Sequence, residues 1–195
     1  MPTRSTAINQ DPEKDGVTLA SGPKKRTTKK KPLPKVKVKA ATKLPNNPFQ
    51  SEILDLVSKQ RSKDKKIEIL HEYRNDALVS LLIWNFDDTV VSALPEGSVP
   101  YKPNDAPAGT EHTSLRAEVR HFYNFVQGGN DSLSKTRREN IFIQILETLL
   151  PEEADILCLV KDKALATKYK VTQSIVAEAY PDIEWGGRGG EKHRG

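Results

Sequence analysis

The side chains that most often carry chemistry are few and widely spaced in this sequence. Its histidines are His71, His112, His121 and His193, and none belongs to an HExxH motif or a Cys/His cluster. A structural zinc ion needs about four ligands, and the single Cys158 adds only one. The stretches QGGNDSL and WGGRGG lack the spacing and the following Lys-Ser/Thr of a phosphate-binding loop. The sequence therefore predicts neither a metal nor another cofactor.

The acidic side chains are expected to cap helices rather than to act as general acids or bases. Asp87 and Asp88 follow IWNF and are predicted to cap a short helix in the segment TVVSAL. Glu152, Glu153 and Asp155 belong to the first turn of another predicted helix, where the helix dipole favours acids. No Ser nucleophile elbow or Cys–His pair is present. We therefore expect a protein that is not an enzyme.

The strongest chemical signal is a concentration of lysine near the N-terminus. Residues 1–46 hold 12 Lys and Arg against 3 Asp and Glu, which leaves 19 basic and 23 acidic residues in 47–195 from totals of 31 and 26. The first segment is strongly positive, whereas the remainder is mildly negative. Ten basic residues with no acid among them lie between positions 24 and 43, namely Lys24, Lys25, Arg26, Lys29, Lys30, Lys31, Lys35, Lys37, Lys39 and Lys43.

Residues 1–46 are predicted to form a disordered tail, because they contain six prolines and no aromatic residue. Such a tail binds phosphates with steep salt dependence and without sequence preference. Three alternatives stay open: a solubilising tail, an anchor on an acidic protein and, in a eukaryote, a nuclear import signal in PKKRTTKKK. Membrane attachment is not expected, since no apolar wedge or lipidation motif accompanies the basic run.

The rest of the composition indicates a soluble, intracellular protein. The sequence has no run of about 18 apolar residues, and its N-terminus has no apolar signal core. The single Cys158 excludes an intramolecular disulfide and fits a reducing compartment. Within DILCLV it is expected to behave as a small buried hydrophobe, because no base or cation adjoins it.

Residues 47–186 are predicted to form one compact all-α domain, followed by a flexible Gly-rich segment, 187–195. The first helix is expected to have Asn47 as its N-cap, Pro48 at its first position and Gln50 completing a capping box. Further helices are expected after Ser62, in 63–73, in 76–86, capped by Asn75, in 114–127, in 134–150 and from Pro151. Their inward faces are expected to include Leu115, Val119, Phe122 and Val126, and then Phe142, Ile145, Leu146 and Leu149.

Two parts of this domain are candidates for contacts with a partner. Residues 94–111 hold four prolines and two glycines and are predicted to form a long loop, a feature that is often functional. Tyr101 within it is either an exposed anchor for a partner or a lid folded over the core. Lys135, Arg137 and Arg138 form a basic cluster at a helix start, which is either a solvated face or a contact for phosphate or an acidic partner.

The segment LATKYKVTQSIVAEAYP, residues 165–181, resembles a helix-turn-helix unit. Leu165, Ala166 and Tyr169 are expected to face inward, with Val171 in the turn. Weak nucleic-acid contacts are predicted from Lys168, Lys170, Thr172, Gln173 and Ser174. Three departures favour simple packing instead: the turn has a lysine where glycine is common, Pro181 shortens the second helix, and Glu178 repels phosphate.

Seven stretches of the domain carry a resemblance to a known family. They are SLLIWNFD (80–87), ALPEGSVPYKPNDAP (93–107), GTEHTSLR (109–116), TRRENIFIQILE (136–147), CLVKDK (158–163), KYKVT (168–172) and AYPDIEWG (179–186). The chain resembles an uncharacterised family of small proteins encoded by tailed phages, notably contractile-tailed phages of cyanobacteria. The resemblance spans most of 67–186 and omits the basic tail. It implies a phage protein in the host bacterial cytoplasm or in the virion, and it transfers no activity.

These observations together predict a non-enzymatic phage accessory protein that associates with nucleic acid, non-specifically, through its basic tail. The helical domain is expected to supply positioning or a surface for a phage or host protein. Two alternatives stay open. The protein is a virion or assembly component, or an adaptor that binds a host protein through the 94–111 loop. The sequence leaves the oligomeric state open.

Overall fold

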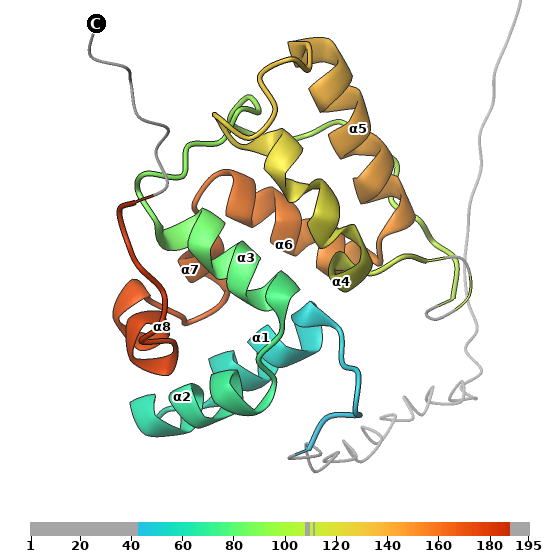
Figure 1. Ribbon diagram of the computed structural model, residues 1–195. Coiled ribbons are helices and arrows are strands. Elements are labelled where there is room, and N and C mark those ends of the chain that lie inside the picture. Colours follow the sequence, from blue (N-terminus) through green and yellow to red (C-terminus); the bar gives the residue numbers. More distant parts are fainter. Residues whose placement is uncertain (1–42, 108–109, 111, 188–195) are drawn as a thin grey trace, which may run out of the picture. The chain divides into compact units, whose positions relative to one another are not determined.

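The computed structural model describes residues 43–107, 110 and 112–187. Most of the predicted tail, residues 1–42, and the C-terminal residues 188–195 lie outside this part of the chain. Within the described residues there are α-helices, one 3-10 helix and no strand, which confirms the all-α prediction. The helices are α1 (Gln50–Lys59), α2 (Lys63–Glu72), α3 (Asp76–Phe86), α4 (Leu115–Glu118), η1 (Val119–Phe125), α5 (Lys135–Thr148), α6 (Pro151–Lys161), α7 (Leu165–Lys168) and α8 (Gln173–Ala179) (Figure 1).

Local signals set the starts of several helices, and those of α3 and α6 were predicted. The Asn75 side chain accepts a hydrogen bond from the backbone N–H of Leu78 at 3.0 Å and so caps α3. Ser134 occupies the N-cap of α5, and Ser62 occupies the N-cap of α2. Pro151 is the first residue of α6, where its missing N–H costs no hydrogen bond.

The first helix begins later than predicted. Its N-cap is Phe49 rather than Asn47, and Pro48 is a buried residue that precedes the helix. The backbone N–H of Phe49 donates to Glu52 Oε2 at 2.9 Å. The next N–H, that of Gln50, donates to a carboxylate on α6 at 2.8 Å. The prediction was wrong because a contact with a distant helix, absent from the local sequence, fixes the helix start.

Residues 89–94 are not the short helix that the sequence predicted. Asp87 does use its carboxylate locally, since Oδ1 accepts from the backbone N–H of Thr89 at 2.9 Å and from its hydroxyl at 2.6 Å. The chain then runs extended, and Ser92 forms an isolated antiparallel bridge with Val126. Two β-branched valines at positions 90 and 91 favour extended backbone, so the turn at Asp87 leads away from α3.

The segment 115–125 contains a change of helix type that alters its buried face. One turn of α-helix, α4, passes into the 3-10 helix η1. Because a 3-10 helix has three residues per turn, the inward positions in η1 recur at every third residue. Leu115 and Phe122 are buried as predicted, and Val119 and Val126 are half-buried and pack against the core. Phe125, which was not predicted to face inward, is fully buried. Gly128, with φ of 78°, ends the segment in the left-handed region.

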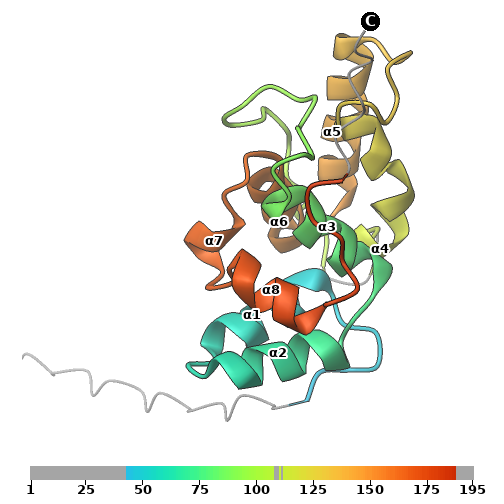
Figure 2. The same ribbon diagram turned by 60° about the vertical axis from the view of Figure 1, so that its left-hand side comes forward.

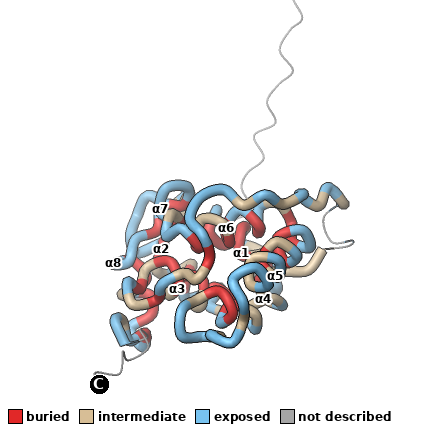
Figure 3. Tube along the Cα trace, turned by 90° about the horizontal axis from the view of Figure 1, so that it is seen from above, coloured by how far each residue is buried: buried red, intermediate tan, exposed pale blue. Residues whose placement is uncertain are grey.

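The core is built around α6, which packs against α1, α3 and α5 (Figures 1 and 2). Buried and exposed stretches alternate along the helices, as expected for amphipathic elements (Figure 3). Four aromatic rings form one part of this core, and Phe125 meets Phe142 edge to face with centroids 5.1 Å apart. The other two rings are Trp84 and Phe122. The stripe predicted for α5, at Phe142, Ile145, Leu146 and Leu149, is buried.

Helix α8 covers α2, although the two lie near opposite ends of the described chain (Figure 2). The Tyr180 hydroxyl, directly after α8, donates to the backbone carbonyl of Leu70 at 2.6 Å. Burial raises the pKa of Tyr180 well above its usual value. Outside this contact, Arg74 binds Asp182 through both guanidinium nitrogens, which lowers the pKa of the exposed Asp182 carboxyl to about 2.

Glu153 forms a junction between the starts of several helices. Its side chain is fully buried, and its two carboxylate oxygens accept from the first backbone N–H of α1, at Gln50 (2.8 Å), and of α4, at Leu115 (2.9 Å). The Gln50 side chain in turn donates to the α3 cap, Asn75, at 3.0 Å. We call this set, Glu153 with Gln50, Leu115 and Asn75, the Glu153 junction.

The junction explains how a buried carboxylate is tolerated. Burial raises the pKa of Glu153, while the two backbone donors lower it. The N-termini of α1 and α4 each present N–H groups without partners inside their own helix, and the carboxylate satisfies one of each. The sequence placed Glu153 correctly in the first turn of α6, but it did not predict that its carboxylate serves two other helices.

Candidate functional site

The predicted nucleic-acid contacts of the tail fall almost entirely outside the described residues. Of the ten basic residues between positions 24 and 43, only Lys43 is described, and it is exposed. The other nine are Lys24, Lys25, Arg26, Lys29, Lys30, Lys31, Lys35, Lys37 and Lys39. The sites that the structure does describe are therefore those on the helical domain.

The helix-turn-helix segment folds as two short helices that serve mainly to close the core. Helix α7 is a single turn, and Ala166 within it is exposed, contrary to prediction. Tyr169 and Val171 are buried in the connection, and Val176 and Ala179 of α8 face inward as predicted. The turn needs no left-handed lysine, because the one non-glycine residue of the described chain with positive φ is Lys163, after α6.

The five polar candidates of this segment lie exposed at the end of α7, in the turn and at the start of α8. They are Lys168, Lys170, Thr172, Gln173 and Ser174. Lys168 Nζ lies 3.1 Å from Asp155 Oδ2, so a carboxylate already balances its charge. Glu178, the residue expected to repel phosphate, pairs with Lys63 at 2.5 Å. Lys170 has no carboxylate within ion-pair distance in the described part of the chain.

Lys170 borders an open hollow of about 510 Å³ that gathers cations from three elements. Lys59 comes from the end of α1, Arg61 from the α1–α2 connection and Lys66 from α2. Asp55 is the one carboxylate among the residues that line it. We call this site the basic hollow, defined by Lys59, Arg61, Lys66, Lys170 and Asp55.

Hydrogen bonds fix the turn against the wall of the basic hollow. Lys66 is 8% exposed, and its Nζ donates to the backbone carbonyl of Lys170. The backbone N–H of Lys170 donates to Ser58 Oγ at 3.4 Å. Sequence reasoning named Lys170 alone. The basic residues of 59–66 were visible in the sequence, but only tertiary packing brings them beside Lys170.

The predicted basic cluster at the start of α5 divides into two kinds of residue. Arg138 supports the fold, because Nε donates to the carbonyl of Asn124 at 2.7 Å and Nη2 to that of Asn130 at 2.8 Å. These bonds tie the end of η1 and the following turn to α5. Lys135 and Arg137 are exposed and stay candidates for phosphate or partner contact.

The 94–111 loop lies against the domain at several points. Tyr101 is half-buried and packs on the core, and burial raises its pKa, so the lid interpretation describes it better than an exposed anchor. Lys161, 3% exposed, donates from Nζ to the carbonyls of Pro95 (2.8 Å) and Gly97 (3.0 Å). It also binds the carboxylate of Asp162. The first part of the loop is therefore held by a fully partnered lysine.

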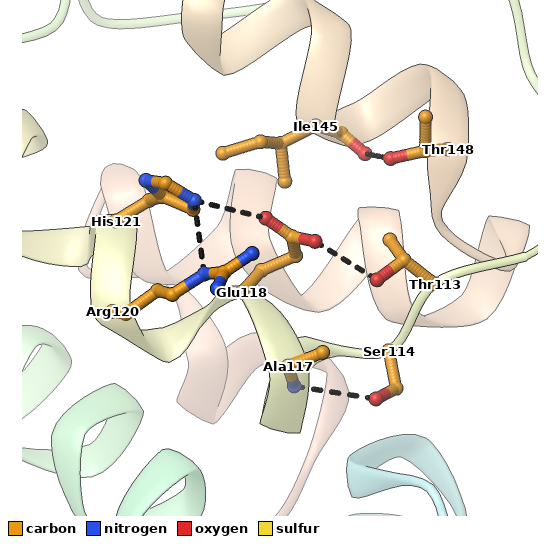
Figure 4. A network of polar contacts seen from close by, with 8 residues as sticks. All are labelled: Thr113, Ser114, Ala117, Glu118, Arg120, His121, Ile145 and Thr148. Carbon is orange, nitrogen blue, oxygen red and sulfur yellow. Dashed lines mark hydrogen bonds and ion pairs between the residues drawn. The ribbon is translucent and has the colours of Figure 1, made fainter.

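The ionisable network nearest to a catalytic arrangement lies between η1 and α5 (Figure 4). Glu118 Oε1 accepts from the Thr113 hydroxyl at 2.8 Å, and Glu118 Oε2 lies 3.8 Å from His121 Nε2. Arg120 Nε lies 3.2 Å from the same His121 nitrogen. The 3.8 Å between Glu118 Oε2 and His121 Nε2 is too long for the hydrogen bond that joins a carboxylate to the histidine of a catalytic triad.

The other reactive side chains of the described residues do not gather into one site. Burial raises the pKa of the Cys158 thiol to about 11, which keeps it protonated near neutral pH. Within the described ranges, no group of three or more His, Cys, Asp and Glu residues is arranged to hold a metal ion. In the same ranges, none of the helices combines the length and apolar character needed to cross a membrane.

The described residues form an all-α protein with a hollow lined by four cations and one carboxylate. The chain belongs to DUF6433, a family of unknown function, whose family model matches residues 53–167. The match extends from α1 to α7 and stops before α8. No curated protein and no solved structure matches the chain.

Proposed function

We propose that this protein is a non-enzymatic phage accessory protein that associates with nucleic acid through its basic N-terminal residues. The observation that carries the proposal is the division of charge along the chain, 12 basic and 3 acidic residues in 1–46 against 19 and 23 in the remainder. A cluster of lysines without acids attracts polyanions by releasing their counterions, and it does so without regard to sequence. The helical domain supplies positioning or a partner surface.

Two further observations support an accessory rather than a catalytic role. The thiol of Cys158 is protonated near neutral pH. In the Glu118–His121 network, the Thr113 hydroxyl donates its hydrogen bond to the Glu118 carboxylate. The similarity of residues 67–186 to small proteins of tailed phages supports the phage assignment. For this reason we propose the host bacterial cytoplasm or the virion as its location, and mass spectrometry of purified particles distinguishes these two.

The proposal is tested with the full chain and a variant in which Lys24, Lys25, Lys29, Lys30 and Lys31 are replaced by glutamine. We measure binding to a random-sequence DNA duplex and to single-stranded RNA by fluorescence anisotropy from 50 to 200 mM salt. Each lysine that neutralises a duplex phosphate contributes about −0.9 to the slope of log K against log salt. The tail variant should therefore show a slope shallower by about 4 and a large loss of affinity.

A matched control removes five exposed cations of the helical domain instead, by Lys63→Gln, Lys65→Gln, Arg74→Gln, Lys102→Gln and Arg120→Gln. The control should keep most of the affinity and the slope of the wild-type chain. Equal binding by the wild-type chain and the tail variant at low salt would refute the proposal. A larger loss of affinity in the control than in the tail variant would show that the nucleic-acid interface lies on the helical domain.

A further inference from the structure

The basic hollow is lined by a largely buried lysine, Lys66, that has no carboxylate partner among the described residues. Lys66 is 8% exposed, and within these residues its Nζ donates to one acceptor, the backbone carbonyl of Lys170. Within the described residues, no carboxylate lies within 4 Å of its Nζ. Burying a charge is costly unless an opposite charge or several hydrogen bonds compensate it.

A second buried lysine shows how this chain otherwise treats such a group. Lys161 is 3% exposed, and its Nζ donates to two carbonyls and to the carboxylate of Asp162. Every N–H of that ammonium therefore has a partner, and its charge is balanced. The ammonium of Lys66, by contrast, donates one of its three N–H groups to an acceptor among the described residues. The other two can bind an anion in the hollow that Lys66 lines.

The surroundings of Lys66 increase the positive charge of the hollow. Lys59, Arg61 and Lys170 line it with Lys66, and Asp55 is the one acid among the lining residues. Lys63 of α2 and Lys168 of α7, which do not line the hollow, are each paired with a carboxylate. Unbalanced positive charge is thus concentrated in a concave site on a domain that is acidic in net charge, and such a site focuses the field that an anion meets.

We propose that the basic hollow binds phosphate groups of a nucleic-acid backbone. Arg61 is suited to bidentate contact with phosphate oxygens, and the three lysines supply point charges. The hollow is open rather than enclosed, which suits a strand that passes through it better than a small molecule that must be surrounded. The proposal rests on the proposed function for the source of the phosphate, and it adds a contact on the folded domain to that of the tail.

The test uses the full chain with the five tail lysines already replaced, so that binding by the domain is measured alone. In that background, Lys59→Gln, Arg61→Gln and Lys170→Gln are introduced together. The matched control carries Lys65→Gln, Arg120→Gln and Lys102→Gln, which removes the same charges from exposed positions outside the hollow. Circular dichroism and thermal melting establish that both variants keep the helical fold.

We expect the hollow variant to bind single-stranded RNA and duplex DNA about tenfold more weakly at 50 mM salt, with a duplex slope shallower by 2 to 3, at about 0.9 per phosphate contact. The control should match its background. Inorganic phosphate, titrated while the backbone amides of Ser58 and Lys170 are followed by NMR, separates the two sources of the ligand. Shifts that saturate with free phosphate at concentrations below those of the oligonucleotide would show a site for the free ion and overturn the nucleic-acid assignment.

The two proposals fail in different ways. Wild-type affinity in the tail variant contradicts the function proposed for the tail, whatever the hollow does. Equal binding by the hollow variant and its control, or no measurable binding by the tail-neutralised background, contradicts the hollow as a phosphate site and leaves the tail proposal intact.

Discussion

The Glu153 junction and the basic hollow are two places where this chain buries an ionisable side chain, and they differ in how that side chain is partnered. Both oxygens of Glu153 accept backbone N–H groups from helix starts, at 2.8 and 2.9 Å. Lys66 has one carbonyl partner and shares its hollow with three further cations. The junction is closed by the fold itself, so we assign it to stability. The hollow is left open, so we assign it to binding.

The largest expected effect is at the junction. Glu153→Ala leaves the N–H groups of Gln50 and Leu115 buried without acceptors, and we expect it to lower the free energy of unfolding by about 3 kcal/mol. Urea denaturation measures the change. The control is Glu152→Ala, which removes an exposed acid from the same helical turn. Similar losses in both variants would show that the junction has no special role.

The comparison of the two buried lysines gives the next largest effect. Lys161→Met removes an ammonium with three partners, and we expect a loss of about 2 kcal/mol and faster hydrogen exchange in residues 95–101. Lys66→Met removes an uncompensated charge, so we expect stability to be unchanged or increased. A loss at Lys66 as large as that at Lys161 would break the distinction between a closed and an open site.

A smaller effect is expected at the α3 cap, which borders the junction. Asn75→Ala removes the acceptor of the Leu78 N–H and should cost about 1 kcal/mol, whereas Asn75→Ser should restore most of it. Combining Asn75→Ala with Gln50→Ala in a double-mutant cycle measures whether the cap and the junction are coupled. Strict additivity would separate the cap from the junction, although the two side chains are hydrogen-bonded.

The smallest effect is expected where the charge is exposed. Arg74 lowers the pKa of Asp182 from 3.8 to about 2, so the ionised carboxylate favours the folded state above about pH 4. This contribution is lost as the pH falls from about 4 to about 2. The melting temperatures of the wild-type chain and of Asp182→Asn should therefore differ at pH 5 and converge near pH 2. Asp105→Asn, which removes another exposed carboxylate, should follow the wild-type curve.

The sequence predicted the parts of the fold that local chemistry determines. Helix α3 begins where Asn75 caps it, α5 begins at Ser134, and the apolar stripe of α5 is buried as expected. The start of α1, which was predicted wrongly, depends on a distant residue. Gln50 begins α1 because its N–H meets a carboxylate 103 positions away, and no local pattern contains that information.

The residues of the candidate site were predictable to the same extent. Lys170 was predicted from its place in a turn. Lys59, Arg61 and Lys66 join it in one site only because α1 and α2 pack beside that turn. Conversely, Arg138 was grouped with exposed cations on the basis of its neighbours in sequence. Its guanidinium instead binds the carbonyls of Asn124 and Asn130, which fold back over the start of α5.

The pairing of α2 with α8 has a consequence for how the chain is made. Helix α2, residues 63–72, packs against α8, residues 173–179, and the Tyr180 hydroxyl donates to the backbone carbonyl of Leu70. During synthesis, α2 leaves the ribosome long before α8 has been translated. The side of α2 that α8 covers therefore stays uncovered while more than half of the protein is translated. A pairing between segments so far apart in the sequence is expected to slow folding.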